Sequence, residues 1–231
     1  MLTTTDHLQP CLHSVRLMKK IQSLAAETQT TLDFDLIKNA IHWAKKYHDG
    51  QWRESGEPFY THPLAVAYTV ADYNLKTDVL VASVLHDIVE DTKVTLGMVL
   101  DDFGWRIAKM VDRLTRDRLD GSRLSVEDIL HNAYKENDTE VILIKIIDRL
   151  HNTLTLGFLP QEKQKEKITE TIKNFLIFAE ELSLSQVSNL LYKECLKLNI
   201  KLGIVDERNI KKRESVFKEA PILPSPTYQN I

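Results

Sequence analysis

The stretch V-A-S-V-L-H-D-I-V-E-D-T, residues 81–92, decides the fold and the chemistry that the sequence predicts. Residues 81–85 are almost entirely apolar, and residues 86–92 carry an imidazole and three carboxylates: His86, Asp87, Glu90 and Asp91. Because residues four apart share one face of a helix, a continuous helix over this stretch gathers these side chains into one polar wall. Carboxylates so close together repel one another unless a cation neutralises them. The stretch therefore predicts a helix that ends in a divalent-metal site.

Residues of the metal-ligand type recur elsewhere in the chain. His62 lies in Y-T-H-P-L, and Asp148 lies four residues before Asn152 in I-I-D-R-L-H-N. With His86 and Asp87 they form a set of two histidines and two aspartates, which suits Mn²⁺, Fe²⁺ or Zn²⁺ better than the thiolate sites of structural zinc do. A metal with open coordination positions lowers the pKa of its bound water towards about 7. We therefore expect a hydrolytic metal site.

Each ligand also has a structural alternative. His62 is also placed to cap the helix that Pro63 opens, since proline suits the first helical turn. Asp148 could instead pair with Lys145 or Arg149 on a surface, but the isoleucines around it indicate a buried helix. An unpaired carboxylate is costly to bury, and a metal would supply its partner.

The apolar residues recur at helical spacing along most of the chain, and only 7 Gly and 7 Pro occur in 231 residues. This pattern predicts an all-α protein. We expect helices near residues 14–28, 33–49, 63–73, 77–90, 96–115, 125–136, 138–156, 162–182 and 184–201. Residues 79–89 are apolar nearly all round, which is typical of a central buried helix.

The length of 231 residues fits one principal domain. We expect an N-terminal helical segment at 1–31, the catalytic domain at 32–200 and a tail at 201–231. The tail is predicted to be partly disordered because its composition shifts to charge and proline.

The net charge of −3 provides no global positive field for nucleic acid or an anionic membrane. The two cysteines, Cys11 and Cys195, stand in no metal or redox motif, which fits a reducing compartment. The sequence shows neither a signal-peptide pattern nor an apolar run of about 18 residues. We expect a cytoplasmic protein with no nucleic-acid or membrane partner. Its oligomeric state is not predicted.

The order of His62, His86-Asp87 and Asp148 resembles the H…HD…D pattern of the HD-domain metal-dependent phosphohydrolases. Four segments narrow the resemblance to the hydrolase domain of the RelA/SpoT homologues, which degrade the alarmone (p)ppGpp. These segments are R-E-S-G-E-P-F-Y-T-H-P (53–63), L-H-D-I-V-E-D-T (85–92), F-G (103–104) and I-K-I-I-D-R-L-H-N (144–152). The resemblance covers about 32–200. It ends where long family members begin their synthetase domain, so the chain looks like a small alarmone hydrolase.

The resemblance implies an HD-domain helical bundle around a central metal-binding helix. It also implies that the chain removes pyrophosphate from the 3′ position of (p)ppGpp and yields GDP or GTP. The implied metal is Mn²⁺. Glu90 and Asp91 would lie beside it and assist the attacking water, one of them as general base. The structural alternative is that they cap the helix end or pair with Lys93.

The resemblance also implies a substrate-binding set. Arg53 would contact the guanine base, with Ser55 in the same loop, while Asn152 and Thr155 match positions near the ribose and the 3′-phosphate. A guanidinium can stack on a purine or bind phosphate through two hydrogen bonds. The three tryptophans, Trp43, Trp52 and Trp105, are expected to be packing residues instead of stacking platforms.

Some residues depart from the family pattern. Glu54 stands where the family often has lysine, Phe59 where it often has tyrosine, and Arg116 where it commonly has lysine. Because Glu54 removes a positive charge near the nucleotide, the preferred alarmone could carry fewer 5′-phosphates, or adenine in place of guanine. Two other functions remain open: hydrolysis of another nucleotide, and alarmone sensing without turnover.

Overall fold

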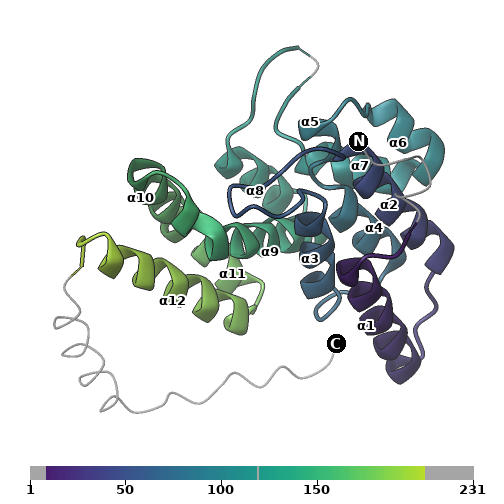
Figure 1. Cartoon of the computed structure of the whole chain (residues 1–231), viewed down its shortest axis with the longest axis horizontal. Helices are drawn as coiled ribbons and strands as arrows, with labels where there is room; N and C mark the ends of the chain where they lie inside the picture. The colour runs from purple at the N-terminus through teal and green to yellow at the C-terminus, as the bar shows by residue number, and fades with distance from the viewer. Residues whose placement is uncertain (1–8, 119, 206–231) are drawn as a thin grey trace.

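The computed structural model describes residues 9–118 and 120–205, and within these ranges it is all-α, as predicted (Figure 1). The only extended pairings there are two isolated bridges, Trp52 with Pro58 and Asp117 with Arg123. The helices are α1 (Leu12–Thr28), α2 (Phe34–Tyr47), α3 (Thr61–Val70), α4 (Thr77–Leu85), α5 (Ile88–Asp91), α6 (Leu96–Phe103), α7 (Trp105–Leu114), α8 (Val126–Lys135), α9 (Thr139–Thr155), η2 (Leu156–Phe158), α10 (Gln161–Glu170), η3 (Thr171–Phe175), α11 (Leu176–Glu181) and α12 (Ser185–Lys201). None of the helices described is long and apolar enough to cross a lipid bilayer.

The centre of the fold is α4, whose residues from Val79 to Leu85 are all buried. It packs against α2, α3 and α7. A helix that is apolar all round has to be enclosed by other helices, because every face loses contact with water. The prediction of a central buried helix in this segment is confirmed.

Helix α9 joins the two halves of the molecule. It packs against α3 and α8 on one side and against α11 and α12 on the other. Figure 1 shows α1 to α7 gathered on one side of α9 and α10 to α12 on the other. The chain thus brings α3, the end of α4 and the middle of α9 together, although they are far apart in sequence.

Three predicted helices are interrupted. The helix expected over 77–90 ends at Leu85 and resumes at Ile88. The helix expected over 96–115 is divided by Gly104, whose φ of +82° is a conformation that favours glycine. The helix expected over 162–182 contains a π-helical turn at Thr171–Phe175. Helical periodicity survives all three interruptions, which is why the sequence pattern did not reveal them.

The two ends of the chain were predicted to lie outside the catalytic domain at 32–200. Helix α1 packs against α3, so this part of the segment 1–31 contributes to the same core. Residues 1–8 and 206–231, which include most of the predicted tail, lie outside the described residues. The boundaries at 31 and 200 stay predictions.

The tryptophans differ from one another. Trp43 is buried and makes edge contacts with Tyr47 and Phe103 at 5.0 Å between ring centroids. Trp52 and Trp105 are 66% and 67% exposed, so for these two the packing prediction is wrong. The Lys109 ammonium lies 5.0 Å from the Trp105 ring centroid.

Candidate metal centre and substrate cleft

The interruption between α4 and α5 falls on the His-Asp pair. His86 and Asp87 form a turn, and the amide of Asp91 donates to the carbonyl of Asp87 at 2.9 Å. In a regular helix neighbouring side chains diverge by about 100° and do not face each other. Here His86 Nε2 and Asp87 Oδ2 are 3.1 Å apart. The expected continuous helical wall is therefore corrected to a turn that lets adjacent side chains converge.

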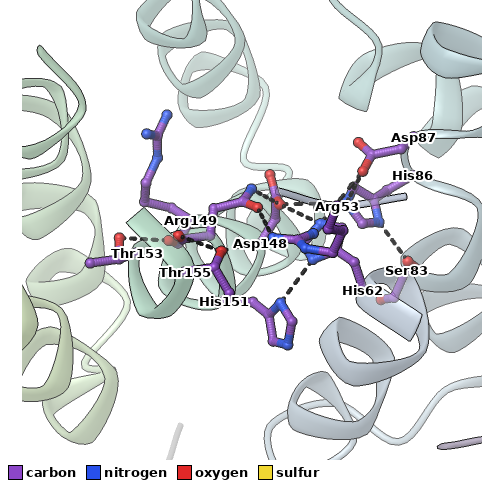
Figure 2. Close-up of polar contacts among 11 residues, drawn as sticks. Arg53, His62, Ser83, His86, Asp87, Asp148, Arg149, His151, Thr153 and Thr155 are labelled. Atoms are coloured by element: carbon purple, nitrogen blue, oxygen red, sulfur yellow. Dashed lines mark hydrogen bonds and ion pairs between the residues drawn. The ribbon is translucent and has the colours of Figure 1, made fainter. Parts of the chain in front are cut away.

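The structure brings all four predicted ligands together (Figure 2). His62 Nε2 lies 3.1 Å from Asp148 Oδ1 and 3.5 Å from Asp87 Oδ2. His86 Nε2 lies 3.1 Å from Asp87 Oδ2 and 3.6 Å from Asp148 Oδ1. Two ligands each about 2.1 Å from one ion are about 3.0–3.4 Å from each other. Neighbouring donors around these four side chains, called the ligand ring below, are therefore about as far apart as two ligands of one divalent ion, and His62, His86 and Asp148 each offer an atom within 4.8 Å of the others.

The histidine tautomers fit a metal. His86 is fully buried, and its Nδ1 lies 2.8 Å from the Ser83 carbonyl, which requires Nδ1 to carry the proton. Its Nε2 has no hydrogen-bond partner and points at the two carboxylates. A buried nitrogen without a partner is costly unless something else binds it. A cation at the centre of the ring would fill that role.

The pKa values of His86 and Asp87 also fit a bound cation. Burial alone would lower the pKa of His86, but the nearby carboxylates of Asp87 and Asp148 raise it to about 10. Burial would raise the pKa of Asp87, and the two histidines hold it below its ordinary value instead. The cluster thus needs positive charge at its centre. Without a metal a proton on imidazole supplies it, and a metal would displace that proton.

His151 is a site residue that the sequence reasoning missed. Its Nδ1 lies 2.9 Å from Nδ1 of His62, while Asp148 lies on the Nε2 side of the same ring. Burial, followed by the charges of His62 and Arg53, lowers the pKa of His151 to about 3, so its neutral ring can accept the His62 proton. Metal-bound histidines commonly donate their other nitrogen in this way. The spacing of three residues from Asp148 on a predicted helix was the available signal.

Glu90 and Asp91 lie at the same cleft with different environments. Glu90 accepts from Arg123 at 2.6 Å and from the backbone amide of Arg116 at 3.2 Å. No ion pair holds the Asp91 carboxylate within the described residues. Partial burial, then the charges of Asp87 and Glu90, raise the pKa of Asp91 to about 6, although the side chain stays open to solvent.

A cleft of about 420 Å³ opens over the ligand ring. The predicted substrate residues line its walls: Arg53, Ser55, Asn152 and Thr155. Arg53 donates to Asn152 Oδ1 at 2.9 Å and to Thr155 Oγ1 at 3.0 Å. Asn152 in turn donates to Asp148 Oδ1 at 2.7 Å. One hydrogen-bonded chain therefore runs from the outer loop to the ligand ring.

The substrate cleft is lined by several cations, although the chain as a whole has a net charge of −3. Lys145, Arg149, Lys167 and Arg116 all line the cleft. Lys145 is only 5% exposed. Burial would raise the pKa of Asp148, but the contacts of its carboxylate with His62 and His86, and to a smaller extent the charge of Lys145, hold that pKa well below the ordinary value. Arg149 donates to Glu170 at 2.9 Å. Neither Lys145 nor Arg149 is the surface partner of Asp148 that the alternative interpretation required.

The model of the HD domain family matches residues 40–184. The chain belongs to the HD-domain family. The matched HD residues contain the whole ligand ring: His62, His86, Asp87 and Asp148.

Several curated proteins are similar in sequence to this HD domain and narrow its place within the family. It is 36% identical over 152 residues to a guanosine-3′,5′-bis(diphosphate) 3′-pyrophosphohydrolase of Haemophilus influenzae, covering 63% of this chain and 22% of that protein. It is 34% identical over 180 residues to the bifunctional (p)ppGpp synthase/hydrolase SpoT of Escherichia coli, covering 74% and 25%. A probable GTP pyrophosphokinase of Mycobacterium leprae is 39% identical over 158 residues, covering 67% and 20%. The resemblance inferred from the motifs is confirmed, and the chain matches 20–25% of the length of these relatives.

A solved structure supports the fold of the HD domain. It is described as a metazoan ortholog of SpoT that hydrolyses ppGpp, and it superposes with a TM-score of 0.54 at 21% identity. The match covers 74% of this chain and 97% of that one. At this identity the likeness shows a shared helical architecture.

Proposed function

We propose that this chain hydrolyses the 3′-diphosphate of (p)ppGpp, releasing pyrophosphate and GDP or GTP. The observation that carries the proposal is the ring of four donor atoms at the floor of a cleft walled by Arg53, Asn152 and Thr155. The names of the curated relatives supply the substrate class. We assign the hydrolase unit to residues 32–200 and place the enzyme in the cytoplasm, acting on a free nucleotide.

The proposed metal is Mn²⁺, held by His62, His86, Asp87 and Asp148. Imidazole and carboxylate together suit this borderline ion. When bound, the ion supplies Lewis-acid stabilisation of the phosphate charge and lowers the pKa of a coordinated water.

We assign the general base to Asp91. Its carboxylate is open to the cleft and its raised pKa lies close to neutral pH, where a base works best. The water attacks the phosphorus linked to the ribose O3′ and forms the new P–O bond while Asp91 takes one water proton. The O3′–P bond breaks, pyrophosphate leaves with the water oxygen, and O3′ takes up a proton from solvent to become the 3′-hydroxyl of GDP or GTP. Glu90, held by Arg123, positions this end of α5 and adds negative charge beside the base.

The nucleoside end is assigned to the outer loop. Arg53 is held by Asn152 and Thr155, so its guanidinium is already ordered when the nucleotide arrives. Ser55 Oγ is buried without a partner, which leaves a donor for the sugar or base. Trp52 places an exposed indole on the same cleft, and aromatic faces stack on nucleobases.

The phosphates are assigned to the inner wall. Lys145 and Arg149 bring two buried positive charges close to the ligand ring. Phosphoryl transfer depends mainly on positioning and on neutralising charge, and these residues supply both. The buried Lys145 also offsets the charge of Asp148 before substrate binds.

The experiment measures pyrophosphate release by the metal-stripped full chain, with and without Mn²⁺, from ppGpp, pppGpp and their adenine counterparts. We expect metal-dependent release that disappears in Asp87→Ala. Asp102→Asn, which changes an exposed carboxylate of α6, is the control and should behave as the parent. The Glu54 hypothesis fails if pppGpp is clearly the best substrate. Binding of ppGpp without release would instead favour a sensor, and release only from other nucleotides would favour a different HD phosphohydrolase.

A further inference from the structure

A second cleft lies between α1 and α3, beyond His151 as seen from the ligand ring. Its volume is about 880 Å³, larger than that of the substrate cleft, and the two clefts share no lining residue. His151 forms part of its wall, and His62 separates this wall from Asp148. The two clefts are therefore separate sites on opposite sides of the His62 ring.

The lining of this cleft is basic. His13, Arg16 and Lys20 follow one another at spacings of three and four residues on α1, so they share one helix face, and Lys19 lies beside them. No carboxylate lines the cleft within the described residues. In a chain with a net charge of −3, this is a local excess of positive charge on one face.

The cations of the cleft differ in whether another side chain already binds them. Lys20 is engaged, since it donates to Asp72 at 2.6 Å and to the Tyr68 carbonyl at 2.8 Å. Arg16 and Lys19 are exposed and form no ion pair with the described residues. Within the described residues, two cations without an ion pair thus line the cleft, while the third, Lys20, is held by α3. The Tyr68 ring, 40% exposed, lies at the same place, with the Lys20 ammonium 3.9 Å from its centroid.

We propose that the cleft between α1 and α3 binds a small anion that carries a diphosphate group, either free or on a nucleotide. An arginine grips phosphate oxygens through two parallel hydrogen bonds, and a neighbouring lysine adds a point charge. A volume of about 880 Å³ accommodates a diphosphate and also a nucleoside attached to it. This proposal does not depend on the hydrolase activity, because its cationic residues lie on α1 and none of them lines the substrate cleft.

The test uses the ¹⁵N-labelled full chain in chelator, titrated with sodium pyrophosphate and separately with GDP. The amides of Ser23 and Thr69 report on the basic cleft, and those of Ser55 and Asn152 report on the substrate cleft. We expect saturable shifts at Ser23 and Thr69. GDP binding more tightly than pyrophosphate would identify a nucleotide, and equal affinities would identify the free diphosphate.

The deciding variant is the double substitution Arg16→Gln with Lys19→Gln. Both side chains are exposed, so the fold should survive, and thermal unfolding checks this. We expect the affinity at Ser23 and Thr69 to fall about tenfold or more, with the Ser55 response unchanged. The matched control, Lys135→Gln with Lys173→Gln, removes the same charge from exposed positions elsewhere and should change nothing. Shifts confined to Ser55 and Asn152, or equal weakening in both double variants, would overturn the proposal.

Discussion

The two walls of the substrate cleft are built in opposite ways. Helix α9 runs without interruption from Thr139 to Thr155 and presents Asp148 and Asn152 one turn apart. The opposite wall is broken between α4 and α5, where His86 and Asp87 converge to 3.1 Å. Residues one helical turn apart have Cβ atoms about 5–6 Å apart, which suits contacts spread along a nucleotide. A metal needs donors about 3 Å apart, and here the broken helix lets adjacent residues supply them.

The largest expected effect tests whether the two walls contribute equally to the metal. Asp87→Asn removes a carboxylate from the broken wall, and Asp148→Asn removes one from the continuous wall. Each should lower pyrophosphate release by about 10³-fold or more, because each takes a charged ligand from the ring. Steady-state rates at saturating Mn²⁺ and Mn²⁺ affinities by calorimetry provide the measurement. A much smaller loss for Asp87→Asn would show that the broken wall does not hold the metal.

The second prediction separates the two acidic residues of α5. Asp91→Asn should lower kcat by about 10²–10³-fold, because it removes the assigned base. Glu90→Gln should cost clearly less, since its carboxylate is occupied by Arg123 and by the Arg116 amide. Equal losses for Asp91→Asn and Glu90→Gln would contradict this assignment.

The pH profile sharpens the same assignment. A base acts in its deprotonated form, so activity should rise as pH increases through the pKa of Asp91. That pKa is about 6 without metal, and a bound cation would shift it lower. In Asp91→Asn the remaining activity should lose this acid limb. An unchanged limb would assign the titration to another group.

The sequence predicted residue types and helix faces better than it predicted interruptions. The apolar run before His86 identified the central helix because burial follows directly from composition. The turn at His86 and Asp87 left no comparable signal, because both residues keep backbone angles in the right-handed helical region and the period of 3.6 is barely disturbed. Gly104 was a visible marker, yet one glycine inside a helical pattern is often tolerated.

Side-chain partners were harder to predict than helices. The sequence placed His62 and Asp148 in motifs, but the contact of His62 with His151 depends on how α3 packs against α9. Likewise, the exposure of Trp52 depends on the loop that carries it, which the bridge to Pro58 holds. Tertiary packing decides these features, and local pattern does not encode them.

The third prediction concerns His151 of α9, which contacts the metal ligand His62 on the side away from Asp148. His151→Phe keeps a ring of similar size but removes the partner of His62 Nδ1. We expect Mn²⁺ affinity to fall about 10–100-fold, with activity largely restored at high Mn²⁺ concentration. Calorimetric titration of the metal-free chain measures this. His131→Phe, on the exposed face of α8, is the control and should leave the affinity unchanged. Unaltered affinity in His151→Phe would mean that the orientation of His62 is fixed by α3 alone.

The smallest expected effect belongs to the loop that lies outside both walls. Trp52→Ala should raise KM for ppGpp about tenfold and change kcat little, because the indole borders the nucleotide and not the reacting phosphorus. Trp52→Phe should keep most of the affinity, since it keeps an aromatic face. Trp105→Ala is the matched control: its indole is equally exposed but lies beside Lys109 and does not line the cleft. If Trp52→Ala and Trp105→Ala have the same KM, Trp52 is a surface residue and Arg53 contacts the base without it. If only Trp52→Ala weakens binding, the loop contributes affinity while the two walls contribute rate.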